Sequence, residues 1–191
     1  MVNKELLGGL SLIICAAGNV VYIRSILQGK TKPHAFSWAV WALLSLMVFY
    51  AQYIKGAGAG AWVTGLITVL NIAIAVLALK YGEKDIRRSD WVSFICALLV
   101  VPVWYVTDDP LLAVIIIIII DAFGYYPTFR KCFYNPYQEN MTLYVTGGLQ
   151  VPFSLLAMGE YSLVNILYPL SLVIGNTALI IMVLYMRKVR A

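Results

Sequence analysis

Long apolar runs separated by short polar segments form the main pattern along this chain. Windows of about 20 apolar residues, the length that crosses about 30 Å of hydrocarbon, can be placed seven times. They lie near residues 5–27, 36–54, 59–80, 90–107, 110–131, 140–158 and 162–186. The pattern predicts an all-α, polytopic membrane protein with seven transmembrane helices and no soluble domain between them.

The composition agrees with this prediction. Of 191 residues, 62% are hydrophobic and only 12% are charged, which is more apolar surface than a soluble domain could bury. The first window could instead be a secretory signal, but its apolar run continues to Tyr22, which favours a membrane helix. Cys15, Cys96 and Cys132 are interpreted as packing thiols, so we expect neither a disulfide nor a metal site.

The basic residues predict the orientation of the chain in the membrane. Short loops on the cytoplasmic side of a membrane protein are enriched in lysine and arginine. With the spans above, twelve basic residues fall on one side and two on the other: Arg24, Lys30, Lys32, Lys80, Lys84, Arg87, Arg88, Arg130, Lys131, Arg187, Lys188 and Arg190, against Lys4 and Lys55. The N-terminus is therefore expected outside and the C-terminus in the cytoplasm.

The net charge of +5 fits attraction to anionic lipid and does not call for nucleic acid. The expected partners are the lipid bilayer and a small-molecule solute, and a homo-oligomer is left open. The short loops favour a bacterial cytoplasmic (inner) membrane.

Residues of the first half of the chain have counterparts in the second half, at a spacing of 103 to 105 residues. The corresponding pairs are Tyr22 with Tyr125, Pro33 with Pro136, Trp41 with Tyr144, Gly56 with Gly159, and Asn71 with Asn176. Their shared order predicts two triple-helix bundles of the same orientation, residues 1–82 and 110–191, within one membrane domain. Residues 83–109 would form a connector and a fourth helix.

This arrangement, with the segment Tyr126-Pro127-Thr128 and the asparagines Asn71 and Asn176 in the third and seventh helices, resembles the SWEET and PQ-loop superfamily. That superfamily includes sugar transporters and KDEL receptors. The resemblance implies solute transport by two triple-helix bundles that rock around a central cavity, with the two asparagines at the substrate positions. The chain departs from the family signature, because threonine follows Pro127 where the family has glutamine.

Two prolines are candidate hinges. Pro127 lies near the end of the fifth predicted helix, and Pro152 lies inside the sixth, where the resemblance implies a hinge proline. The second helix has no proline at the position that corresponds to Pro152. We therefore expect bending to be concentrated in the second bundle.

Asp121 is the first candidate for chemistry. At 1.5 Å per residue from Pro110 it lies roughly 16 Å down its helix, near the bilayer midplane. An ionised carboxylate is costly there, so it should face a wet cavity, pair with a polar group, or bind a proton. The functional interpretation is a proton-coupling site or a contact for a substrate cation. The alternative is a hydrogen bond to Asn19 or to a tyrosine that holds helices together.

Other polar and aromatic residues lie at a similar depth. Amide side chains donate and accept hydrogen bonds and suit the recognition of hydroxyls or amides, but they also join neighbouring helices. Trp41 could stack on a ligand, whereas Trp38, nearer the interface, is assigned to an aromatic belt. The candidate substrate-binding residues are Asn71, Asn176, Trp41, Asn19 and Gln150.

Residues near the inner ends of the helices receive simpler interpretations. His34 is expected to be a solvated loop residue, with pH sensing as the alternative. Arg24, Arg130 and Lys131 are expected to anchor the chain in lipid headgroups, with anion binding as the alternative. Tyr125 could gate the inner mouth or anchor the helix.

The sequence thus predicts a transporter that moves a small polar solute, such as a sugar, an amino acid or a vitamin-like compound, by alternating access. Asp121 would couple transport to protons or contact a substrate cation. The alternative is a ligand- or peptide-binding receptor or scaffold of the same fold, similar to KDEL receptors, without solute flux. We expect no enzyme activity and no cofactor, because no phosphate loop, metal-ligand spacing or nucleophile–base pair is present.

Overall fold

The computed structural model describes residues 3–83 and 86–190, and within them it leaves out the side chains of Pro127 and of several residues between 89 and 105. Lys84 and Asp85 of the predicted connector therefore lie outside the described residues. The described chain is helical and contains no strand. Its helices are α1 (Lys4–Leu27), α2 (Ala35–Ile54), the short η1 (Gly58–Ala61), α3 (Trp62–Tyr81), α4 (Arg88–Thr107), α5 (Pro110–Tyr134), α6 (Thr142–Leu149), α7 (Val151–Leu156) and α8 (Leu163–Val189).

Local side-chain caps begin three of the long helices. Asn3 accepts a hydrogen bond from the Leu6 amide at the start of α1, and Ser162 accepts one from the Asn165 amide at the start of α8. Asp109 accepts hydrogen bonds from two amides at the start of α5, where Pro110 occupies the first turn. These side chains satisfy amides that lack an intrahelical partner.

Five helical segments in the described residues are long and apolar enough to cross a membrane: α1, α2, Gly58–Tyr81, α5 and α8. The chain is therefore an all-helical protein with the character of a membrane protein. The predicted spans 90–107 and 140–158 correspond to α4 and to the pair α6 and α7, which are not among these five.

The sixth predicted helix is not continuous. It is divided into α6 and α7 at Gln150, whose backbone keeps helical angles with φ −74° and ψ −23°. Pro152 is in the first turn of α7. A proline has no amide hydrogen and its ring clashes with the carbonyl four residues before it, which interrupts the regular helical hydrogen bonding here.

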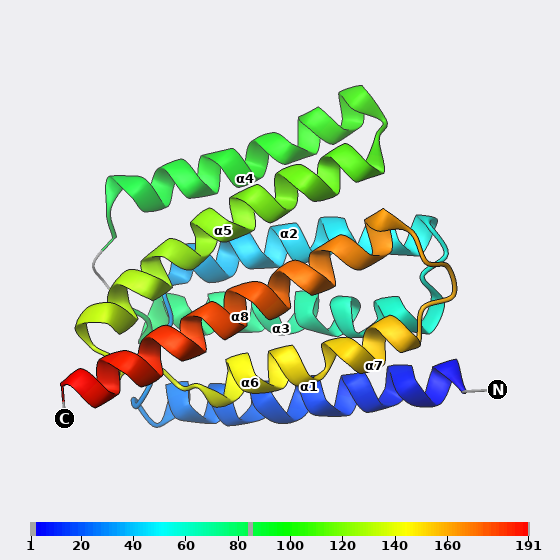
Figure 1. The fold of residues 1–191 in the computed structure, drawn as a ribbon. Helices are drawn as coiled ribbons and strands as arrows, with labels where there is room; N and C mark the ends of the chain where they lie inside the picture. Colours follow the sequence, from blue (N-terminus) through cyan, green and yellow to red (C-terminus); the bar gives the residue numbers. More distant parts are fainter. Residues whose placement is uncertain (1–2, 84–85, 191) are drawn as a thin grey trace.

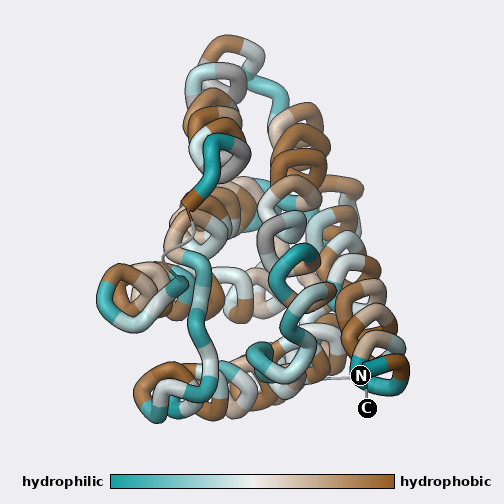
Figure 2. The backbone as a smooth tube through the Cα atoms, turned by 90° about the vertical axis from the view of Figure 1, so that its left-hand side faces the viewer, coloured by the Kyte–Doolittle hydropathy of each residue, from teal (hydrophilic) through white to brown (hydrophobic). Residues whose placement is uncertain are grey.

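Six of the segments form a closed ring (Figures 1 and 2). α3 packs against both α1 and α2, and α8 packs against both α5 and α6. The ring closes because α1 packs on α6 and α2 packs on α5. α4 lies outside the ring against α2 and α5, at the top of Figure 1.

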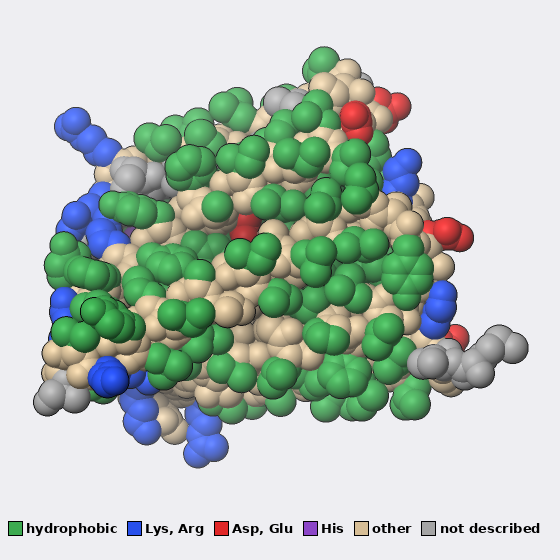
Figure 3. All heavy atoms as spheres, in the orientation of Figure 1, with side chains coloured by type: hydrophobic (Ala, Val, Ile, Leu, Met, Phe, Trp, Pro, Cys, Tyr) green, Lys and Arg blue, Asp and Glu red, His purple; other side chains and the backbone are tan. Residues whose placement is uncertain are grey.

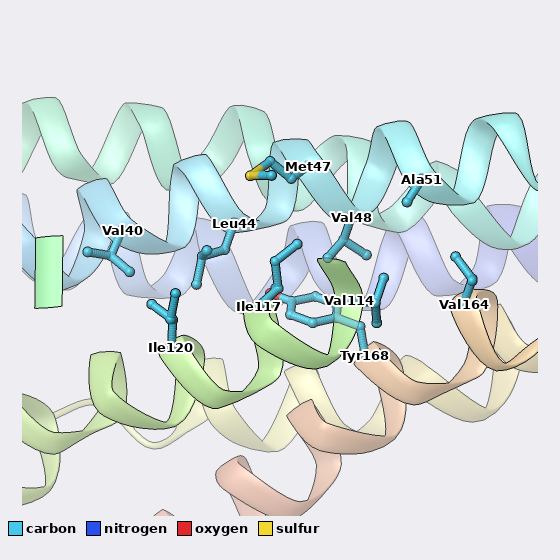
Figure 4. Packing of buried hydrophobic residues seen from close by; sticks show 10 residues of the cluster. All are labelled: Val40, Leu44, Met47, Val48, Ala51, Val114, Ile117, Ile120, Val164 and Tyr168. Atoms are coloured by element: carbon cyan, nitrogen blue, oxygen red, sulfur yellow. The ribbon is translucent and has the colours of Figure 1, made fainter. Parts of the chain in front are cut away.

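One of two buried apolar clusters joins α2, α5 and α8 (Figure 4). On α2 the buried residues recur every three or four positions, so that they share one face of the helix. Tyr168 of α8 lies between α2 and α5 in this view. The cluster consists of Val40, Leu44, Met47, Val48, Ala51, Val114, Ile117, Ile120, Val164 and Tyr168.

The end of the ring that holds the α2–η1 and α7–α8 turns is joined by backbone hydrogen bonds. The Glu160 amide donates to the Gly56 carbonyl at 3.1 Å, and the Gly159 amide donates to the Ala57 carbonyl at 2.9 Å. Gly56 has a φ of +68°, a conformation that glycine adopts without steric cost. The two turns thus hold this end of the ring together.

Charge is distributed unevenly between the two ends. Apolar side chains cover the middle of the visible face, and most of the Lys and Arg side chains gather at the end where the C-terminus lies (Figures 1 and 3). We call this end the basic end. Acidic side chains gather at the opposite end (Figure 3).

Candidate functional site: a central polar cavity

A cavity of about 90 Å³ lies among the helices of the ring. A buried water occupies roughly 10–15 Å³ on this measure, so the cavity has room for several waters or a small solute. Every helix of the ring contributes to it, and none of the described residues that line it belongs to α4. The lining residues are Cys15, Asn19, Trp38, Trp41, Ile67, Asn71, Asp121, Tyr125, Leu143, Tyr144, Gly147, Gln150, Tyr168, Leu172 and Asn176.

Asp121 lines this cavity from α5. Only 3% of the Asp121 surface is exposed. Its Oδ1 atom has no hydrogen-bond partner among the described residues. Asn19, which we considered as its partner, instead donates to the Cys15 carbonyl of its own helix at 3.0 Å. An unpartnered buried carboxylate oxygen is costly, so it needs a proton, a water or a ligand.

The amides predicted as substrate contacts lie around the same cavity. Asn71 donates to Ser45 Oγ at 3.3 Å and thereby connects α3 with α2. Asn176 Oδ1 accepts from the Tyr125 hydroxyl at 2.8 Å and thereby connects α8 with α5. These bonds fix the orientation of both amides, and they join helices within each half of the chain.

Aromatic rings form a continuous series along one side of the cavity. The ring centroids are 5.3 Å apart for Tyr22 and Trp38, 5.2 Å for Trp38 and Trp41, and 5.3 Å for Trp41 and Tyr125. Such spacings are typical of favourable edge and tilted ring contacts. Trp38 is 4% exposed, so its assignment to an aromatic belt was wrong; α2 turns it toward the other rings.

Two further polar atoms at the cavity have no hydrogen-bond partner among the described residues. They are Trp41 Nε1, a donor, and Gln150 Oε1, an acceptor. Gln150 lies where α6 ends and α7 begins. With Asp121 Oδ1, three buried polar atoms of residues that line the cavity thus have no hydrogen-bond partner among the described residues.

Glycines allow the helices and rings to approach this closely. A Cβ atom at Gly124 would lie 3.0 Å from Trp41 Nε1, and one at Gly175 would lie 2.9 Å from the Tyr125 ring. A Cβ atom at Gly147 would lie 2.9 Å from Asn176 Nδ2. The shape of the cavity thus depends on the absence of side chains at these positions.

Of the two candidate hinge prolines, the structure describes the side chain of Pro152 but not that of Pro127. Pro152 is exposed and lies at the break between α6 and α7, next to Gln150 of the cavity. Pro127 falls within the α5 range, two residues after Tyr125, but its side chain is outside the described part of the structure.

A second, polar pocket of about 350 Å³ lies at the basic end. Beside it, Lys131 of α5 forms an ion pair with Glu139 and donates to the Lys32 carbonyl. Both residues of the pair are buried, since only 9% of Lys131 and 4% of Glu139 is exposed. The expectation that Lys131 anchors the chain in lipid headgroups was therefore wrong. The pocket is lined by Ser25, Lys30, Thr31, Tyr137, Glu139, Asn140, Met141, Thr142 and Arg187.

His34 also differs from its expected role. It precedes α2 and is only 5% exposed, so its interpretation as a solvated loop residue was wrong. Its Nδ1 atom lies 3.4 Å from Ser37 Oγ. The two residues can meet because Ser37 follows His34 by three positions, which is about one helical turn.

Tyr168, Leu172 and Ile67 are among the cavity residues that were not predicted from the sequence. A signal was present, because Tyr168 and Leu172 precede Asn176 by eight and four positions and residues four apart share a helix face. The same spacing relates Ile67 to Asn71. Extending the position of Asn71 by one turn, and that of Asn176 by one and by two turns, would have identified these residues.

No group of three or more histidine, cysteine or acidic side chains in the described residues could hold a metal ion. Comparisons with known proteins find no matching family model, no similar curated protein and no similar solved structure.

Proposed function

We propose that the chain is a membrane transporter that moves a small polar solute through the central cavity by alternating access. The observation that carries the proposal is Asp121, a buried carboxylate with an unpartnered oxygen at a cavity lined by all the helices of the ring. A buried acid inside a bundle of apolar helices is costly and marks a pathway for ions or solutes.

The packing of the helices supports a parallel repeat with seven membrane crossings. In the first half α3 packs between α1 and α2, and in the second half α8 packs in the same way between α5 and α6. Between the halves, the contact of α1 with α6 corresponds to the contact of α5 with α2. Asn71 and Asn176 both line the cavity, and the turns at Gly56 and Gly159 are bonded to each other. Residues related by a two-fold axis through the cavity would meet in this way.

The break at Gln150 supports bending in the second bundle. A helix that is interrupted beside a binding site allows its two parts to move separately. Pro152 and Pro127 would act as the hinges, and the bundle α1–α3 would serve as the less flexible partner.

Uptake into proteoliposomes tests the transport function. The purified chain is reconstituted, and the entry of labelled sugars, amino acids and organic cations is measured with and without a proton gradient. We expect at least one solute to enter, and we expect Asp121→Asn to reduce its rate at least tenfold. Asp109→Asn is the matched control, because Asp109 is exposed at the start of α5 and asparagine also caps a helix.

Two results would contradict the transporter proposal. One is the absence of flux for every solute class by a correctly folded, reconstituted chain. The other is flux that the substitutions Asp121→Asn, Asn71→Ala and Asn176→Ala all leave unchanged.

A receptor of the same fold is the second candidate function, and the polar pocket at the basic end favours it. This pocket holds Lys30, Arg187 and Glu139 and is larger than the central cavity. A peptide or anionic ligand held there would need no path through the membrane. Tight peptide binding without any solute flux would support this candidate.

A further inference from the structure

The lining of the central cavity contains an acidic residue but no basic residue among those described. Among the described residues that line it, Asp121 is the only carboxylate, and no lysine, arginine or histidine is present. The other titratable groups there are the Cys15 thiol and the hydroxyls of Tyr125, Tyr144 and Tyr168, which are neutral near pH 7. A carboxylate that ionises in this cavity therefore has no positive partner within the lining.

The aromatic rings near Asp121 are also suited to a positively charged ligand. Tyr125 follows Asp121 by one helical turn on the cavity face of α5, and its ring contacts that of Trp41 at 5.3 Å. The electron-rich face of tryptophan or tyrosine attracts cations, and quaternary ammonium groups are bound in this way. A carboxylate beside such rings is suited to a cation that is too large or too alkylated to need several hydrogen bonds.

We propose that the substrate is a small organic cation that carries no carboxylate, held by Asp121 and the rings of Trp41 and Tyr125. This inference rests on the transport function proposed above and names its substrate class. The unpartnered Gln150 Oε1 and Trp41 Nε1 would bind a hydroxyl or amide on the rest of the molecule.

The same lining disfavours other solutes. An amino acid would bring its carboxylate next to Asp121 with no basic group to bind it, and like charges repel strongly at low dielectric. A neutral sugar would leave Asp121 to be compensated by a proton alone. The cavity of about 90 Å³ limits the group that enters it to a small one.

Binding to matched probes tests the substrate class. Choline is compared with 3,3-dimethylbutan-1-ol, which has the same shape without the charge, and with glycine betaine, which adds a carboxylate. Tetramethylammonium, N-methylpyridinium and glucose complete the panel. Affinity is measured by calorimetry and by the shift of the melting temperature of the full chain in detergent.

We expect at least one cation to bind tenfold or more tightly than its neutral or zwitterionic counterpart. Asp121→Asn should weaken that cation at least tenfold, Trp41→Ala should also weaken it, and Asp109→Asn should leave it unchanged. The comparison of choline with its neutral counterpart uses the native chain, so it stands even where Asp121→Asn does not fold.

Equal binding of the charged and neutral members of the pair, preferential binding of glucose, or no binding by any cation at millimolar concentration would overturn the inference. These outcomes are distinct from a failure of the transport function. Glucose uptake that depends on Asp121 would leave transport intact and refute the cation. Cation binding without uptake would support the cation and refute transport.

Discussion

At the scale of single residues, the ion pair of Lys131 and Glu139 has the clearest energetic consequence. Both are buried and bonded to each other. Removal of one partner leaves the other charge buried and uncompensated, which typically costs about 3–5 kcal/mol. We expect Glu139→Gln to lower the melting temperature in detergent strongly, and Glu139→Gln with Lys131→Met to restore much of the loss. Glu160→Gln is the control, since Glu160 is exposed; equal effects of the two glutamine variants would contradict the prediction.

The same residues show how far sequence reasoning reaches. The depth of Asp121, Asn71 and Asn176 along apolar helices follows from counting residues, and all three line the cavity. Helix rotation does not follow from counting, because the apolar residues surround each helix and leave no polar face to orient it. Trp38 and Lys131 were therefore assigned to lipid although both are buried.

At the scale of helices, close packing of α1 on α6 depends on Gly18. A Cβ atom there would lie 1.8 Å from Thr146 Oγ1 and 2.8 Å from its Cβ, so Gly18→Ala must displace α6. Overpacking of this kind costs about 1–3 kcal/mol. We expect a lower melting temperature for Gly18→Ala and its recovery when Thr146→Gly is added. Gly9→Ala is the control on the same helix, because a Cβ atom at Gly9 meets no atom within 4 Å; a loss of stability there as large as for Gly18→Ala would refute the proposed contact.

The existence and order of the helices could be predicted because apolar length alone identifies them. The division of the sixth helix at Gln150 was not predicted as a break, although Pro152 was recognised as a hinge. A proline inside a membrane helix bends it or ends it according to what its neighbours can bond. That outcome depends on tertiary contacts, which the sequence pattern does not contain.

At the scale of the whole molecule, the two ends of the ring are held by different forces. One end is joined by backbone bonds between the turns at Gly56 and Gly159. At the basic end a charged side chain joins the two halves, because Lys131 of α5 donates to the Lys32 carbonyl between α1 and α2. The proposed alternating access would require that these two sets of contacts break in turn, because a cavity open at both ends would leak.

This requirement predicts opposite motions at the two ends. Spin labels at Lys55 and Tyr161 report the end with the bonded turns, and labels at Lys30 and Lys188 report the basic end; all four side chains are exposed. In lipid nanodiscs, double electron–electron resonance should give two distance populations for each pair. A solute that accumulates in proteoliposomes should shift both pairs, so that one distance lengthens as the other shortens. Distances that lengthen together, or that do not respond to a transported solute, would exclude alternating access in this ring, because the contacts that seal one end must form as those at the other are lost.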